Sequence, residues 1–192
     1  MHGCPPDEIQ QIADYLISDR KLHTTVKLNP TLLGKEELNK IILNSGFTTN
    51  VPDEAFEHDL KYTDAVSIIS YLRNKAKEKE VFFGLKLTNT LESVNNKEIF
   101  PKKEPMMYAS GKVLHPISIN VARKLNNEFK GNIDISFSGG ADAYNIHDIL
   151  KTGIFPVTVC SDLLKPGGYG RLHQYLQNIS DLQLPEAITS VI

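Results

Sequence analysis

The sequence of 192 residues contains only two cysteines, Cys4 and Cys160, which lie far apart and form no C-x-x-C pair. This scarcity argues against a zinc ribbon, a self-contained iron–sulfur cluster and a disulfide scaffold. An excess of charge of one sign is also lacking, because 21 basic side chains stand against 23 acidic ones. Such a balance provides no long-range field that would attract nucleic acid, so no nucleic-acid partner is expected.

Long apolar runs are missing as well. No stretch approaches the ~20 apolar residues that span a bilayer, so no membrane partner is expected. The first residues, MHGCPPDE, lack the basic and apolar segments of a signal peptide. These absences predict a reducing, cytoplasmic compartment. The chain is long enough to bury the core of one domain, or of a piece of a larger one.

Helical and strand-like periods alternate along the chain. Helices are expected around 6–17, 38–42, 63–76, 116–129, 145–153 and 172–179, and strands at 23–28, 47–51, 81–87, 133–137 and 156–160. Thr63 and Asn145 are the expected caps of two of these helices. The polar stretch from Glu92 to Pro105 has no clear period and is predicted to be a long loop. Strand–helix alternation requires crossover connections and a mostly parallel sheet, which predicts an α/β fold.

The number of expected strands bears on the architecture. A complete (β/α)8 TIM barrel takes about 250 residues, so this chain is short for one. It is either an open sheet or the later part of a barrel whose first strands are missing, and the opening residues resemble a strand end. We favour the second interpretation. Residues 1–182 are then a partial TIM barrel made of its later strand–helix units, and residues 183–192 are a C-terminal tail.

Two glycine pairs follow the last expected strands. Gly139-Gly140 comes after one strand, and Gly167-Gly168 leads into the last helix. Glycine lets backbone N–H groups approach an anion, and barrels commonly bind phosphate in the loops after their last two strands. These loops, with Ser161 between them, predict a phosphate-bearing ligand, although ordinary turns would use the same residues.

Two strands end alike, with a lysine near the carboxyl end: KLN around Lys27 and KLTN around Lys86. Ligands gather at this end of the strands in α/β folds. Lysine in a strand is costly to bury without a partner, so a binding role is expected for both lysines. Asn29, Thr88 and Asn89 are expected to join them. A structural salt bridge is the alternative.

Candidate catalytic groups are few. Cys4 lies beside a strand end and is a candidate thiolate, although a packed thiol is commoner. Glu57, His58 and Asp59 offer proton-transfer groups, and an exposed polar loop would read the same way. The six histidines show no ligand spacing, so no metal site is predicted.

Five motifs resemble, in the same order, a family of bacterial iron–sulfur flavoproteins named "putative selenate reductase subunit". They are HGCPP at 2–6, VKLNPTLLG at 26–34, GLKLTNT at 84–90, SGGADA at 138–143 and SDLLKPGGY at 161–169. The middle of those proteins resembles the flavin-binding barrel of dihydropyrimidine and dihydroorotate dehydrogenases. The resemblance therefore implies part of an NAD(P)H-linked, flavin-dependent oxidoreductase, inactive as a fragment. FMN would bind here, with iron–sulfur clusters and FAD only in parts of the full-length protein outside this chain.

The resemblance also implies roles for individual residues. Lys27 matches a lysine that approaches the flavin, and Thr88-Asn89-Thr90 match a segment that lines the site. Ser110-Gly111 match a segment ahead of a helix that begins with proline. Gly139-Gly140 and Cys160-Ser161 match the loops that hold the flavin phosphate, and Cys4-Pro5 matches a loop that follows a strand. The mobile loop that carries a catalytic cysteine or serine in those dehydrogenases has no recognisable equivalent here. The polar stretch at 92–105 occupies a comparable place but contains no cysteine.

Three hypotheses follow. The first is a flavin-type barrel module that binds a small-molecule substrate and contacts other domains of the full-length protein. The second is a barrel that serves only as a scaffold or docking module. The third is a non-redox barrel enzyme acting on a phosphorylated small molecule. A parallel barrel without its first strands would also expose two sheet edges, so self-association or a rearranged N-terminus is expected.

Overall fold

The computed structural model describes residues 4–185. Its longer helices are α1 (Pro6–Asp14), α2 (Lys35–Asn44), α4 (Tyr62–Glu78) and α5 (His115–Glu128), and its shorter ones are α3 (Asp53–His58), α6 (Ile146–Lys151) and α7 (Leu172–Asn178). The strands are β1 (Thr24–Leu28), β2 (Phe83–Leu87), β3 (Leu91–Val94), β4 (Met106–Ala109) and β5 (Ile135–Phe137). A π-helical turn covers Tyr15–Asp19, and 3-10 turns cover Pro30–Leu33, Gly111–Leu114, Ser161–Leu164 and Gly168–Arg171.

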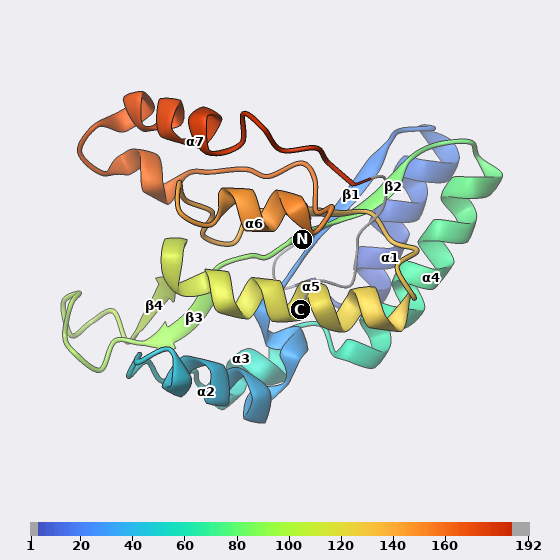
Figure 1. Cartoon of the computed structure of the whole chain (residues 1–192). Coiled ribbons are helices and arrows are strands. Elements are labelled where there is room, and N and C mark those ends of the chain that lie inside the picture. The colour runs from blue at the N-terminus through green and yellow to red at the C-terminus, as the bar shows by residue number, and fades with distance from the viewer. Residues whose placement is uncertain (1–3, 186–192) are drawn as a thin grey trace.

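A parallel sheet in the order β1-β2-β5 forms the centre of the molecule, and Val157 adds a parallel bridge to Phe137 beyond β5. Sheet order follows chain order, and helices occur in each connection (Figure 1). Neighbours in a barrel succeed one another in this way. The expected fold class is therefore confirmed: the chain is an α/β protein with the architecture of a partial barrel.

The two faces of the sheet differ in polarity because side chains alternate along a strand. Val26, Leu28, Leu85, Leu87 and Phe137 are buried in one continuous core with the helices. Helices α4 and α5 both contact β2, and α1 packs against α4 (Figure 1). Of the positions on the opposite face, Lys27 and Lys86 line the functional site described below.

Two expected strands differ from the structure. Residues 47–51 are not a strand: Phe47 is exposed, and the Asn50 carbonyl accepts a bond from the Val94 amide of the hairpin. Residues 156–160 contribute only the bridge at Val157, because Pro156 has no N–H to extend the ladder.

The expected loop at 92–105 is partly wrong as well. Its first residues pair in β3 with β4 as an antiparallel hairpin, which projects from the body of the molecule (Figure 1). The Asn95 side chain closes this hairpin by donating to the carbonyls of Phe100 and Glu104.

Neither of the two expected capping residues caps its helix. Lys61 rather than Thr63 precedes α4, so the expected cap there is wrong. Asn145 does precede α6, but its side chain bonds the loop before it instead of capping the helix. The motif residues His2 and Gly3 lie outside the described residues, and so does most of the expected tail.

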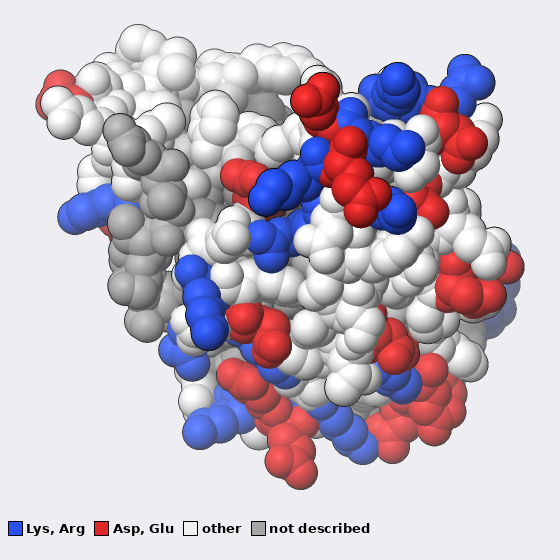
Figure 2. All heavy atoms as spheres, turned by 90° about the vertical axis from the view of Figure 1, so that its right-hand side faces the viewer, with Lys and Arg blue, Asp and Glu red and all other residues white. Residues whose placement is uncertain are grey.

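The surface charge and the apolar length of the helices agree with the composition of the chain. Acidic and basic side chains are interspersed on the face formed by α1 and α4, without a patch of one sign (Figure 2). Among residues 4–185, no helix has the length and apolar character needed to cross a bilayer.

Candidate cofactor-binding site

A cavity of about 590 Å³ opens at the carboxyl ends of the parallel strands. Its volume lies within the ~300–1,000 Å³ that is typical of small-molecule sites. Its walls come from the loops after β2, β4, β5 and Val157. The polar, glycine and cysteine residues of its lining include Lys27, Lys86, Thr88, Thr90, Ser110, Gly111, Lys112, Ser138, Gly140, Asp142, Cys160, Ser161, Asp162 and Lys165.

Two lysines lie side by side in the strands that border this cavity. Lys27 of β1 and Lys86 of β2 are register partners, so their side chains leave the same face of the sheet. Neither ammonium group forms an ion pair with a residue in the described range. Partial desolvation and the neighbouring Lys86 charge lower the pKa of Lys27. The alternative interpretation, a structural salt bridge, therefore finds no partner within residues 4–185, and an anionic group between the lysines would relieve their repulsion.

Hydrogen bonds fix the strand ends beside the lysines. The buried Thr88 hydroxyl lies 2.8 Å from the Ser118 hydroxyl of α5, and Ser138 donates to the Thr88 carbonyl. The Asn89 amide donates to the Asn29 side-chain oxygen at 2.5 Å. Neither asparagine lines the large cavity. This asparagine pair therefore joins the end of β1 to the end of β2, and the hydrogen bond between the two side chains stabilises the frame around the site.

Three loops meet at one point of the wall. A Cβ atom built on Gly140 would lie 2.2 Å from the Gly111 carbonyl oxygen, and one built on Gly111 would lie 2.9 Å from the Ser161 Cβ. Gly139 lies against Ser118 in the same tight manner and does not line the cavity. Glycine at these positions allows the loops after β4, β5 and Val157 to touch one another. Close loop packing is the property of the Gly139-Gly140 pair that the contacts support.

The second glycine pair lies elsewhere. Gly167 has φ +101° and precedes the last 3-10 turn, which begins at Gly168 with φ +50°. Neither lines the cavity, whereas Cys160 and Ser161 of the preceding loop do. Of the residues expected to hold phosphate, the structure therefore brings Gly140, Cys160 and Ser161 together at the cavity and leaves Gly139 and Gly167-Gly168 outside its lining.

The two candidate catalytic residues lie together in a separate, smaller space. Cys4 and His58 line a cavity of about 20 Å³ with Asn29 and Asp59. That volume holds about one water molecule. Lys27 borders this space as well as the large cavity, so the two are neighbours across one side chain. Cys4 is half-buried, and Asp59 accepts a bond from Thr31.

Sequence reasoning missed the buried acids of the wall. Asp162 is 5% exposed and accepts hydrogen bonds from Lys165, from Arg171 through two nitrogens, and from the Tyr175 phenol at 2.7 Å. Burial alone would raise the pKa of Asp162, but these donors outweigh it and bring that pKa to about 2. Burial and the Asp162 carboxylate raise the pKa of Tyr175. The segment SDLLK offered the only sequence signal, a polar residue directly after a strand.

Asp142 is the second buried acid. One of its carboxylate oxygens accepts the N–H groups of Tyr144 and Asn145, and the other lies 3.5 Å from the Lys112 ammonium group. Lys112 is mostly exposed and also lies 5.6 Å from the centre of the exposed Tyr144 ring. Each of the two rim lysines, Lys112 and Lys165, is thus held by a buried carboxylate. Within residues 4–185, no group of His, Cys, Asp and Glu suits a metal ion.

Comparison with known proteins identifies the family. Residues 1–191 match the family described as "Oxidoreductase YgfK, N-terminal TIM-barrel domain". The chain therefore belongs to this family of oxidoreductase TIM-barrel domains.

Two curated relatives agree with the family. Proteins named "Putative oxidoreductase YgfK" from Escherichia coli strain K12 and from Escherichia coli O157:H7 are each 49% identical to it over 180 residues. These matches cover 93% of this chain and 17% of each relative, so the chain spans about a sixth of the length of the relatives. The family and these relatives support the oxidoreductase and barrel parts of the sequence interpretation. The name selenate reductase stays a prediction.

Proposed function

We propose that this YgfK-type barrel domain binds FMN at the cavity above its parallel strands, as one module of a multidomain flavin-dependent oxidoreductase. The observation that carries the proposal is the pair of register-matched lysines, Lys27 and Lys86, in the wall of a cavity of about 590 Å³. Two cations that form no ion pair within residues 4–185 favour a ligand with an electron-rich or anionic ring edge.

The donor set of the cavity fits such a group. Lys27 and Lys86 would address the flavin ring edge, and the hydroxyl groups of Thr90, Ser110 and Ser161 would bond polar parts of the ligand. The tight contact between Gly111 and Gly140 would keep the wall fixed while the ligand enters. When bound, a flavin supplies hydride or electron transfer. The protein residues supply position and charge.

In the full-length protein, the other redox cofactors would lie in further domains. Iron–sulfur clusters, FAD and the site for NAD(P)H would lie outside this chain, and other domains would contact the barrel near the cavity. Selenate reduction is one reaction that the sequence resemblance suggests. The share of the relatives that this chain spans leaves ample length for such domains.

A flavin titration tests the proposal. The purified chain, and a longer form that includes further barrel strands, would be titrated with FMN while flavin absorbance and fluorescence are recorded. Any chromophore that copurifies would be released and identified by mass. We expect binding by the longer form at least, and about tenfold weaker binding by the variant Lys86→Met, which loses one charge-assisted contact.

The control and the contrary outcomes are defined by the same titration. Lys102→Met changes an exposed lysine of the hairpin loop and should bind FMN like the unaltered protein. No binding by either form, with excess FMN, would refute the proposal and favour the scaffold hypothesis. A copurifying colourless phosphate ester would favour the non-redox enzyme instead.

A further inference from the structure

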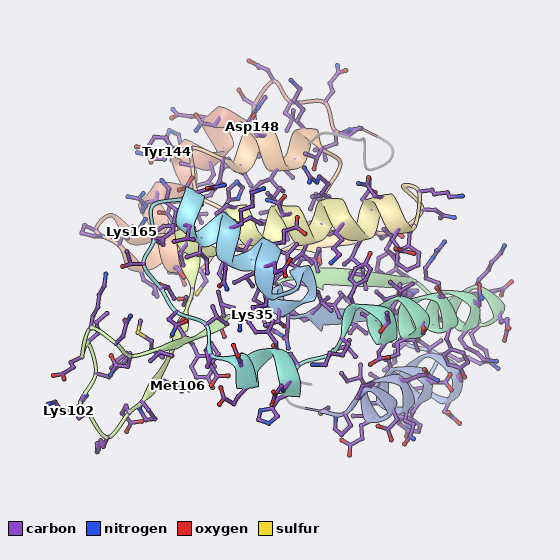
Figure 3. The ribbon with its side chains drawn as sticks, turned by 90° about the horizontal axis from the view of Figure 1, so that it is seen from below. Lys35, Lys102, Met106, Tyr144, Asp148 and Lys165 are labelled. Atoms are coloured by element: carbon purple, nitrogen blue, oxygen red, sulfur yellow. The ribbon has the colours of Figure 1, made fainter. Side chains whose placement is uncertain are left out.

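Lys165 lies at the rim of the cavity, and its orientation is set by a buried acid. Its ammonium group donates to Asp162 at 3.0 Å. The Lys165 side chain is 50% exposed and that of Asp162 only 4%. Both residues line the cavity, so the cation lies on the open side of the pair and the carboxylate on the closed side. Lys165 and Tyr144 are labelled on the same side of the molecule in Figure 3.

Asp162 is itself firmly held. Arg171 contacts both of its carboxylate oxygens, and the Tyr175 phenol donates to one of them. The same phenol oxygen lies 3.4 Å from the carbonyl of Ala141, and Asn178 donates to the carbonyl of Ala143. Helix α7 thereby fastens the loop after Val157 to the loop after β5. One carboxylate shared by two cations leaves a net positive charge at this end of the cavity.

We propose that Lys165 is the phosphate-binding cation of the site, and that Asp162 is the positioning residue that aims it. The inference rests on the proposed function and deepens it by assigning the phosphate end of the ligand. The Asp162 carboxylate does not repel the phosphate appreciably, because four donor contacts already occupy it and its side chain is nearly closed to the cavity. Lys27 and Lys86 lie at the strands and would address the other end of the ligand.

Comparing FMN with riboflavin isolates this role, because the two share a ring and differ in the phosphate. The unaltered protein should bind FMN more tightly than riboflavin. Lys165→Met should weaken FMN about tenfold and leave riboflavin unchanged. Lys102→Met, at the tip of the hairpin (Figure 3), is the matched control and should change neither affinity.

A double-mutant cycle tests the positioning role of Asp162. Asp162→Asn should also weaken FMN, and the effect should disappear in the Lys165→Met background, since Asp162 acts through that lysine. A merely structural role would weaken both flavins and would persist without Lys165. Equal losses for the two flavins, or unaltered FMN binding by Lys165→Met, would overturn the inference.

Inorganic phosphate separates this inference from the proposed function. Phosphate should raise the melting temperature of the unaltered protein and of Lys102→Met, but not that of Lys165→Met. If neither flavin binds and this phosphate effect remains, the proposed flavin function fails while the phosphate site stands. Absence of both effects refutes both.

Discussion

Replacement of Gly140 by alanine tests the convergence of loops that forms the cavity wall. The new Cβ would lie 2.2 Å from the Gly111 carbonyl oxygen and 2.8 Å from its carbon, and both are backbone atoms that have no rotamer to change. Gly140 also has φ +77°, which costs an L side chain about 1–2 kcal/mol. Overpacking adds about 1–3 kcal/mol, so we expect Gly140→Ala to lower the free energy of unfolding by about 2–5 kcal/mol.

A second glycine separates the two contributions. Gly46 has nearly the same backbone angle, φ +75°, but a Cβ there would meet nothing within 4 Å. Gly46→Ala should therefore cost only the backbone part, about 1–2 kcal/mol. Urea denaturation of the two variants and the unaltered protein measures both values. Equal losses of stability would refute the reasoning, because the contact between Gly140 and Gly111 would then contribute nothing.

Three further predictions concern stability and assembly. The pKa of Asp162 is lowered to about 2, so its ion pairs stabilise the fold fully above pH 4. About 2 kcal/mol of unfolding free energy is lost as the pH falls toward 2. Asp162→Asn should flatten this part of a pH-dependent unfolding curve. Leu125, fully buried on α5, should cost about 2–5 kcal/mol on replacement by alanine, measured by urea denaturation, and a loss below 1 kcal/mol would contradict its place in the core. The outer edge of β1 pairs with no strand within residues 4–185, so light scattering should detect self-association, and a monomer at high concentration would count against it.

The repeated elements of the fold could be predicted from sequence because their signals are local. The apolar spacing of α1, α4 and α5 and the short apolar runs of β1 and β2 match the structure within a few residues. The wrongly predicted strands occur where strand pairing depends on residues that are distant in sequence. β3 and β4 pair with each other, but each has only four residues. The polar segment between them shows no helical or strand period. At 47–51, the short run predicted a strand between those at 23–28 and 81–87, but β1 and β2 pair directly with each other and leave no place between them.

The site was predictable where it follows strand ends. A position at or just after the carboxyl end of a strand is enough to place Lys27, Lys86, Thr88 and Ser161 at one cavity, because parallel strands end on the same side of a sheet. The glycines were harder to interpret. A glycine can admit a ligand, a neighbouring loop or a positive φ, and the sequence is identical in all three cases. Only the contacts around Gly140 identify the neighbouring loop.

The buried acids mark the limit of the sequence argument. Asp162 is one of 23 acidic residues, and the residues next to it in sequence do not indicate that its carboxylate is buried away from water. Burial of a carboxylate is tolerable only when several donors replace that water, and two of its donors, Arg171 and Tyr175, come from positions nine and thirteen residues later. Arg171 ends the last 3-10 turn and Tyr175 lies in helix α7, and together these two elements bring both donors back to the loop that carries Asp162. A segment that looks like a peripheral last helix thus determines where the Lys165 cation points.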